Sequence, residues 1–357
     1  MSLRSVSLTG APREMGRQFG EELRAEAQAM ARTRLDLALQ AAQEVSPRLD
    51  LDWCLSLAAE CVPYLEQYAP AVYQEFVGIA EGAGLTLPQM VIGNGWTDYG
   101  DLLRRRGIEE IGGCTSLAVG GDLTAGHRTF VAQTWDMSPT ARPYLVMVKR
   151  QPQAGPATLS LTTAGCLSLI GLNEAGIAVG NTNLLPTDAR PGVHYLAIIH
   201  NVLAQSSFES ARRAIIEGPR LSGHYYYLAG PGGEFCGIET SATRHQVIEP
   251  TLGVYVHTNH YLGKVMLDSG LTTPPKANSR ARQQRMEELT GKLHGGVSAE
   301  TIRSLLSDHG GENPICRHTD DPASWASVAA AVISPEQRRM WARAGNPCQG
   351  EMQEYHC

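Results

Sequence analysis

The sequence predicts an α+β protein in which β-sheets lie inside and helices lie outside. Apolar residues recur every three to four positions through the first third of the chain, as in amphipathic helices, and the period changes to two from Cys114 onward. Further helical patterns interrupt and follow the strands. Stacked sheets with helices on their outer faces would bury the apolar side of every element.

The first third of the chain, residues 1–113, is expected to be a helical segment. Its expected helices cover residues 13–43, 53–68 and 70–81, with a short fourth helix after Pro88. Gly82 and Gly84 follow the third helix, as at a usual helix end. A charged loop, Arg104-Arg105-Arg106, closes the segment.

The remainder, residues 114–357, is expected to be the sheet domain. Strands are predicted over residues 114–120, 129–134, 144–149, 158–163, 167–172, 177–181, 225–229, 235–239, 245–248, 253–257 and 325–333. Helices are predicted over residues 208–217, 279–293 and 298–308. Ser279 and Ser298 are plausible N-caps for the last two helices.

Composition excludes several functional classes. The chain has 357 residues, 43% of them hydrophobic and 18% charged, which is typical of globular proteins. A net charge of −6 offers no basic patch for nucleic acid. No stretch approaches the roughly 18 apolar residues of a membrane span, and the N-terminus lacks the apolar core of a signal peptide. We therefore expect a cytoplasmic protein that binds neither nucleic acid nor membrane.

Eight cysteines are scattered along the chain without a Cys-x-x-Cys pair, which indicates reduced thiols. Most are expected to be ordinary buried or surface residues. Cys114 differs because Gly112 and Gly113 precede it and a strand begins with it. An acyl shift from nitrogen to sulfur at the Gly113–Cys114 bond, followed by hydrolysis, would free the cysteine amine. That amine could then serve as the base that activates the thiol.

Asp136 and Asn183 are candidates for the same site. If Gly120-Gly121 begins a turn, the next strand returns antiparallel and brings Asp136 back towards Cys114. Its carboxylate could orient an α-ammonium group, or it could simply end the strand at the surface. Asn183 is a candidate donor to an oxyanion, whereas Asn173 lies in a turn and is expected to be structural.

The stretch His257-Thr258-Asn259-His260 ends another predicted strand. Asn259 could donate its amide to a tetrahedral intermediate, an interaction worth roughly 3 kcal/mol. The two histidines, with Cys316 and His318, are residue types that bind metals. A strand would place His257 and His260 on opposite faces, however, so no metal site is expected.

Arg317 follows Cys316 in a segment that begins with a predicted helix end. Its planar guanidinium could bind a substrate carboxylate. Alternatively, it could form a salt bridge with Asp136 or Glu312. The sequence does not choose between these roles.

Five short stretches, taken in order, resemble the isopenicillin-N acyltransferase (acyl-CoA:6-aminopenicillanic acid acyltransferase) family of N-terminal nucleophile hydrolases, to which β-alanyl-dopamine hydrolase is related. They are Gly-Cys-Thr (113–115), Gln-Thr-Trp-Asp (133–136), Gly-Leu-Asn-Glu-Ala-Gly (171–176), His-Thr-Asn-His (257–260) and Asp-His-Gly-Gly (308–311). The resemblance spans roughly residues 10–350. The chain ends in Tyr-His-Cys rather than a peroxisomal tripeptide, which suggests a bacterial-type member.

This resemblance implies a four-layer αββα sandwich and cleavage between Gly113 and Cys114 into a heterodimer of two chains. It implies that Cys114 is the nucleophile and its freed amine the base, that Asp136 positions the amine, and that Asn259 forms the oxyanion hole. Roles for Asn183 and Arg317 follow from a looser likeness to the choloylglycine hydrolase branch. No cofactor is implied.

The resulting functional hypothesis is a self-cleaving amidohydrolase or acyltransferase that forms an acyl-Cys114 intermediate. Its substrate would be a non-peptide acyl amide or acyl thioester, with an acyl-CoA as a candidate donor, and hydrolysis is the favoured outcome. One alternative is an unprocessed, non-catalytic homologue that acts as a binding protein. Another is a metal-dependent hydrolase that uses His257, His260 and His318.

Overall fold

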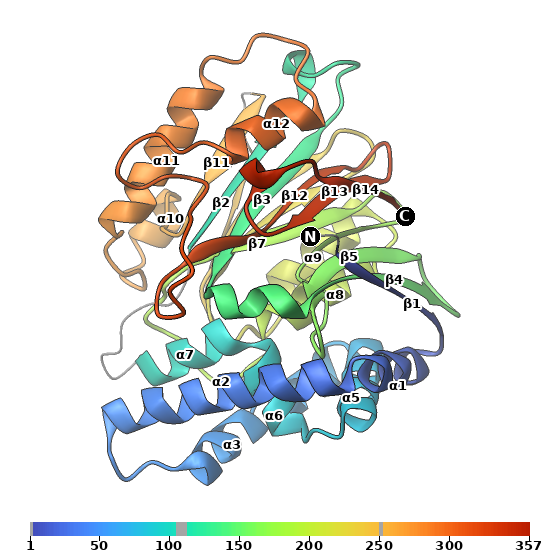
Figure 1. Ribbon diagram of the computed structural model, residues 1–357, viewed down its shortest axis with the longest axis vertical. Coiled ribbons are helices and arrows are strands. Elements are labelled where there is room, and N and C mark those ends of the chain that lie inside the picture. The colour runs from blue at the N-terminus through green and yellow to red at the C-terminus, as the bar shows by residue number, and fades with distance from the viewer. Residues whose placement is uncertain (1–2, 105–112, 250–252) are drawn as a thin grey trace.

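The computed structural model describes residues 3–104, 113–249 and 253–357. Two β-sheets, one of eight strands and one of six, lie face to face, with helices on their outer sides (Figure 1). Helices α11 and α12 cover the six-stranded sheet, and helices α8 and α9 cover the eight-stranded sheet. Their bounds are α8 Tyr195–Leu203, α9 Phe208–Glu217, α11 Ala277–Thr290 and α12 Ala299–Leu306. The expected α+β class and the αββα layering are confirmed.

The N-terminal segment contains a strand as well as helices. Its elements are β1 (Arg4–Gly10), α1 (Pro12–Glu22), α2 (Arg24–Val45), α3 (Leu51–Ala59), α4 (Val62–Tyr68), α5 (Pro70–Ala83), α6 (Leu87–Asn94) and α7 (Trp96–Arg104). The prediction of one helix over residues 13–43 was wrong, because the chain breaks at Leu23, where φ is −116° and ψ is 27°. Arg105 and Arg106 lie outside the described residues.

The eight-stranded sheet has the order β1-β4-β5-β6-β7-β8-β9-β10. Its strands after β1 are β4 (Leu145–Pro152), β5 (Thr158–Thr163), β6 (Ile170–Asn173), β7 (Ala178–Asn183), β8 (His224–Ala229), β9 (Phe235–Thr240) and β10 (His245–Ile248). Strand β1 pairs in parallel with β4, whereas the other neighbours are antiparallel. The N-terminal segment thus supplies an edge strand to a sheet otherwise made by residues after Cys114.

The six-stranded sheet is antiparallel, with the order β11-β2-β3-β12-β13-β14. Its strands are β2 (Gly113–Val119), β3 (Phe130–Met137), β11 (Val254–His257), β12 (Ala326–Ser334), β13 (Arg339–Ala344) and β14 (Gln353–His356). Short helices complete the chain: η1 (Gly121–Leu123), η2 (Pro139–Tyr144), α10 (Lys264–Leu267) and η3 (Pro347–Gln349). Strands β13 and β14 lie outside the ranges predicted from the sequence.

The two faces of β2 belong to different cores. Leu117 and Val119 pack with Met286 of α11 in the core between the six-stranded sheet and its helices. Cys114 and Ala118 belong to the larger core that fills the space between the sheets. Because side chains alternate along a strand, Gly113 lies on the helix-covered face and Cys114 on the inter-sheet face.

Among the described residues, no single helix is long and apolar enough to cross a membrane. Helices α5 and α6 together have the length and apolar composition of a membrane span, but they are bent by 106° at their junction.

A buried charge network joins the N-terminal segment to the sandwich. Glu75 of α5 accepts a hydrogen bond from Arg150 Nε of β4 at 2.7 Å and contacts His200 Nε2 of α8 at 3.2 Å. Arg150 also donates to Ser160 on β5 at 3.0 Å. Burial alone would raise the pKa of Glu75, but Arg150 and His200 together lower it to about 2. The carboxylate is therefore ionised and paired between three elements.

Replacing Glu75 with Gln should lower the free energy of unfolding by about 3–5 kcal/mol, because the buried Arg150 would lose its carboxylate. Glu81→Gln is the matched control, since Glu81 lies on the same helix and pairs with Arg13 in an exposed ion pair. That change should have little effect. Urea unfolding at neutral pH measures both variants, and equal losses would contradict the role of the network.

The same network sets a pH dependence. The folded-state pKa of Glu75 is below its ordinary value, so its stabilisation is complete above pH 4.5 and is lost as the pH falls towards about 2. The stability difference between the wild type and Glu75→Gln should shrink over that window.

Candidate active site

Cys114 is held through both of its backbone groups at the start of β2. Its N–H donates to Oδ1 of Asn259 at 2.8 Å, and its carbonyl oxygen accepts from Nη1 of Arg282. The residue is only 6% exposed. These contacts hold the Cys114 backbone on both sides of its Cα, through the N–H of the Gly113–Cys114 peptide bond and the carbonyl of the next one.

Asn259 connects three parts of the fold. It follows β11, which pairs with β2 so that His257 lies opposite Ser116. Its backbone N–H donates to Ser279 Oγ at 2.9 Å, and its Nδ2 donates to the carbonyl oxygen of Asn183 at 3.0 Å. The side chain of Asn259 therefore bridges the Cys114 backbone to the end of β7.

Ser279 does not cap its helix, contrary to the sequence-based prediction. Helix α11 begins two residues earlier, at Ala277, and Lys276 occupies the cap position. The hydroxyl of Ser279 instead accepts from Asn259. Ser298 does cap α12, accepting a hydrogen bond from the Thr301 N–H.

Arg282 is a site residue that the sequence analysis missed. It lies on α11, is 1% exposed, and its Nη2 donates to Oδ1 of Asn259 at 2.9 Å. It also donates to Thr115 Oγ1 at 3.0 Å and to Asn278 Oδ1 at 3.1 Å. A signal was present, because Asn278, Ser279 and Arg282 form a polar stripe at helical spacing on a helix expected to cover a sheet.

Asp136 lies directly opposite Gly113 in the β2–β3 register, as the predicted turn required. Its Oδ1 accepts from Ser327 Oγ at 2.8 Å, while its buried Oδ2 has no hydrogen-bond partner within the described residues. Burial raises the pKa of Asp136, although Arg282 and Arg317 act in the opposite direction. The carboxylate is thus beside the backbone at the strand start, on the face opposite the Cys114 side chain.

Arg317 approaches the same junction from a loop. A Cβ added to Gly113 would lie 3.3 Å from Arg282 Nη2 and 3.6 Å from Arg317 Nη1, so two guanidinium groups border this glycine. The Arg317 N–H donates to Ser327 Oγ at 3.0 Å, and Ser327 in turn contacts Asp136. In the described parts of the chain, no ion pair joins Arg317 to Asp136 or Glu312. Gly112, before the candidate cleavage site, lies outside those parts.

Asn183 reaches the site through its backbone. Its carbonyl oxygen accepts from Asn259. Its side-chain amide is buried, and neither polar atom has a hydrogen-bond partner within the described residues. A buried amide without partners is costly, and it leaves a donor free for a further group.

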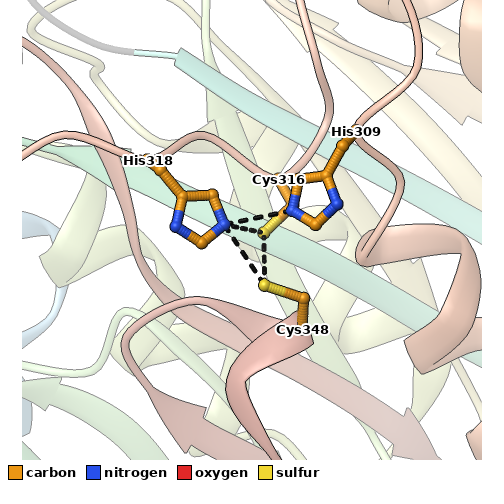
Figure 2. A group of neighbouring side chains, drawn as sticks. All are labelled: His309, Cys316, His318 and Cys348. Atoms are coloured by element: carbon orange, nitrogen blue, oxygen red, sulfur yellow. Dashed lines mark hydrogen bonds between the residues drawn. The ribbon is translucent and has the colours of Figure 1, made fainter.

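The three histidines of the metal-hydrolase hypothesis do not form a common site. His257 contacts Glu239 Oε1 at 2.9 Å and stacks on Tyr225, and its side chain is fully buried. His260 contacts Ser279 Oγ at 2.9 Å. His318 instead contacts His309, Cys316 and Cys348 (Figure 2). Each residue therefore has partners of its own.

An apolar pocket opens at the end of β3 that borders Cys114. Its cavity of about 60 Å³ is lined by Met137, by Trp96 and Trp325, and by residues of α2 and η2 that are mostly apolar but include Arg34 and several hydroxyl side chains. Met137 follows Asp136 and therefore lies on the same face of the sheet as the Cys114 side chain. The pocket offers apolar surface on the side of the thiol.

The chain is similar to known proteins over most of its length. A family model described as acyl-coenzyme A:6-aminopenicillanic acid acyl-transferase matches residues 123–349, which begin after Cys114. The acyl-coenzyme A:6-aminopenicillanic-acid-acyltransferase 40 kDa form of Emericella nidulans is 24% identical over 349 residues, covering 96% of this chain and 92% of that protein.

Two solved structures are also similar. Penicillin V acylase from Agrobacterium tumefaciens has a TM-score of 0.44 and 16% identity, covering 65% of this chain and 83% of its own. A mutant of conjugated bile acid hydrolase from Clostridium perfringens has a TM-score of 0.47 and 11% identity, covering 68% of this chain and 97% of its own.

Replacing Asp136 with Asn should stabilise the intact chain at neutral pH. Because burial raises the pKa of Asp136, the folded state binds its proton more tightly than the unfolded state, and the wild type loses stability as the pH rises through that pKa. The advantage of Asp136→Asn should therefore disappear below about pH 4, where the carboxyl is protonated in both states.

Unfolding midpoints between pH 3 and pH 8 measure this difference, with both chains in a Cys114→Ala background so that they stay intact. Asp122→Asn, at an exposed position, is the control. An Asp136→Asn chain less stable than the wild type at pH 7 would contradict the raised pKa.

Proposed function

Because this chain belongs to the acyl-coenzyme A:6-aminopenicillanic acid acyltransferase family, we propose that it is a self-cleaving cysteine enzyme that transfers acyl groups from amides or thioesters. Membership of the family supports an enzyme that transfers acyl groups, and hydrolysis is the case in which water is the acceptor. The proposal adds cleavage between Gly113 and Cys114 and assigns Cys114 as the nucleophile. The observation that carries it is the capture of both Cys114 backbone groups by Asn259 and Arg282.

Cleavage requires the Cys114 thiol to add to the carbonyl carbon of Gly113. The C–N bond then breaks, the nitrogen takes a proton, and a thioester with a free α-amine results. Water hydrolyses the thioester, leaving a carboxylate on Gly113 and restoring the thiol. Arg282 and Arg317 border Gly113 and could stabilise negative charge there.

The α-amine formed by cleavage would lie near the carboxylate of Asp136, which is already in position in the uncleaved chain. Asp136 lies opposite Gly113, and its Oδ2 is buried without a hydrogen bond in the described structure of the uncleaved chain. An α-ammonium group formed at Cys114 would bring a compensating charge to this carboxylate. Burial raises the pKa of Asp136 even though Arg282 and Arg317 are nearby, and an α-ammonium group would add a further positive charge that favours the carboxylate.

In turnover, the α-amine takes the thiol proton and the thiolate attacks the acyl carbon. This activation is needed because an ordinary cysteine, with a pKa near 8.5, is only a few per cent thiolate at neutral pH. Asn259 Nδ2 would release the Asn183 carbonyl oxygen and donate to the oxyanion instead. The Asn183 amide, which has no partner among the described residues, is a second donor. The acyl group then passes from Cys114 to water or to an amine.

The pocket at Met137 favours an apolar acyl group, because most of its exposed lining is apolar, with Arg34 and a few hydroxyl groups as its polar part. Arg317 is proposed to bind a carboxylate elsewhere on the substrate. An acyl-CoA is a candidate donor, and water is the favoured acceptor. Chains 1–113 and 114–357 would remain together as a heterodimer, since β1 pairs with β4, and the expected location is cytoplasmic.

Cys114→Ala should abolish both cleavage and activity, whereas Cys114→Ser should cleave slowly, because a hydroxyl can make the same shift. Intact mass and N-terminal sequencing of the purified protein measure the cleavage. Cys236→Ala, at another buried cysteine outside the site, should cleave normally.

Two wild-type chains, of which the larger starts at Cys114, would support the proposal. An intact wild-type chain would favour the non-catalytic binding protein, and a cleaved Cys114→Ala chain would exclude the mechanism. Acyl amides and CoA thioesters of increasing chain length then define the substrate.

Asn259→Ala should slow cleavage, because it removes the acceptor for the Cys114 N–H. It should also lower kcat of the cleaved fraction by about two to three powers of ten through loss of an oxyanion donor. Asn201→Ala, on α8, is the control, since the side chain of Asn201 contacts Gln205 and Tyr68, which lie outside the site. Wild-type kcat in cleaved Asn259→Ala would remove Asn259 from the oxyanion hole.

A further inference from the structure

A second cluster of reactive side chains lies in the C-terminal part of the chain, apart from the thiol of Cys114. We call His309, Cys316, His318 and Cys348 the thiol–imidazole cluster. The first three lie on the loop after α12, and Cys348 lies on η3. Figure 2 shows the two imidazole rings and the two thiols pointing at one another from these segments. Their nitrogen and sulfur atoms all lie within 4.8 Å of one another.

Four of the six distances between these atoms are close to those in the coordination shell of a zinc ion, and the two between His309 and the sulfurs lie within 4.8 Å. With Zn–S near 2.3 Å and Zn–N near 2.0–2.1 Å, a tetrahedral site places sulfurs about 3.8 Å apart, sulfur and nitrogen about 3.6 Å apart, and nitrogens about 3.3 Å apart. The Cys316–Cys348 sulfur distance is 3.6 Å, and Nε2 of His318 lies 3.5 Å and 3.2 Å from these sulfurs. The Nε2 atoms of His309 and His318 are 3.0 Å apart.

We propose that the thiol–imidazole cluster binds a structural zinc ion. Two thiolates and two imidazoles favour zinc over magnesium, calcium or manganese, which prefer oxygen ligands. Four protein ligands complete the tetrahedron and leave no position for substrate, as in structural rather than catalytic zinc sites. Cys316 is buried, whereas His309 is exposed, so an ion can enter from solvent.

Groups around the cluster fit this assignment. Asn346 Nδ2 lies 3.5 Å from Cys316 Sγ and can donate to a thiolate there. Such outer contacts orient metal ligands and support their charge. A Cys316–Cys348 disulfide is the rival state, but a sulfur distance of 3.6 Å is far longer than the roughly 2.05 Å of a disulfide.

The zinc ion would fix the segment that presents Arg317. Arg317 stands between two of the ligands, Cys316 and His318, and its carbonyl oxygen accepts from Asn346 Nδ2 at 2.6 Å. Its N–H contacts Ser327, which contacts Asp136. The metal is therefore assigned a positioning role: it joins the loop after α12 to η3 and holds Arg317 at the border of Gly113.

This site differs from the metal alternative considered from the sequence. Cys316 and His318 were candidates there, but with His257 and His260 as partners. The structure provides His309 and Cys348 instead. Cys348 is separated from Cys316 by 32 positions, a distance at which no short motif points to a pair.

The metal content of protein purified without chelator tests the proposal, using inductively coupled plasma mass spectrometry. We expect about one zinc per wild-type chain, and its loss in Cys348→Ser and His309→Ala. Matched controls are Cys357→Ser and His356→Ala, which change the same residue types near the C-terminus outside the cluster. The Cys114→Ala chain should also bind zinc, so the result does not depend on cleavage or activity.

Cobalt substitution gives a readout that does not require the variants to fold. Wild-type protein with Co²⁺ should show thiolate-to-cobalt charge transfer and the visible bands of a tetrahedral ion, and chelation should lower its melting temperature. A wild-type chain without stoichiometric zinc or these bands would overturn the proposal. So would zinc retained in folded Cys348→Ser, or a Cys316–Cys348 disulfide in the protein as isolated.

Discussion

The structure depends on how the start of strand β2 is held from its sides. Cys114 is the second residue of β2, and its two backbone groups are bound by Asn259 and Arg282. Strands β11 and β3 flank β2 and fix its register. An α-amine created at this position would therefore appear where the peptide nitrogen already lies, so the site needs no later rearrangement of the strand.

Because side chains alternate along β2, the thiol of Cys114 and the charged groups near Gly113 lie on opposite faces of the sheet. The inter-sheet face carries the thiol and borders the apolar pocket at Met137. The helix-covered face carries Asp136, Arg282 and Arg317, all near Gly113. The Cys114 backbone lies between the two faces. An amino group at this position could therefore contact the Asp136 carboxylate on one face and the Cys114 thiol on the other. Membership of the acyltransferase family is consistent with this arrangement.

The parts of the fold that could be predicted are those set by local pattern. Alternation and the turn at Gly120-Gly121 predicted that Asp136 returns towards Cys114, which its pairing with Gly113 confirms, and the ordered motifs identified the family. The break at Leu23 was missed because neither glycine nor proline marks it. Strand β13, with the sequence Arg-Met-Trp-Ala-Arg-Ala, lacks the β-branched residues that signal a strand.

Contacts between distant segments could not be predicted in the same way. Arg282 belongs to the site only because α11 packs on β2, and no short motif reports that packing. The same holds for the approach of Cys348 to Cys316. Such residues have the composition of an ordinary helix or loop, and tertiary packing alone gives them their neighbours.

The parallel pairing of β1 with β4 has a consequence for the molecularity of folding. If the Gly113–Cys114 bond is cut, the smaller chain still supplies an edge strand and the buried Glu75 to the larger one. The two chains could then separate only by unfolding, and refolding would become a reaction of two molecules whose rate falls on dilution. The cleaved protein would then be stable for kinetic reasons: it would persist because it unfolds slowly, and its separated chains would not readily reassemble.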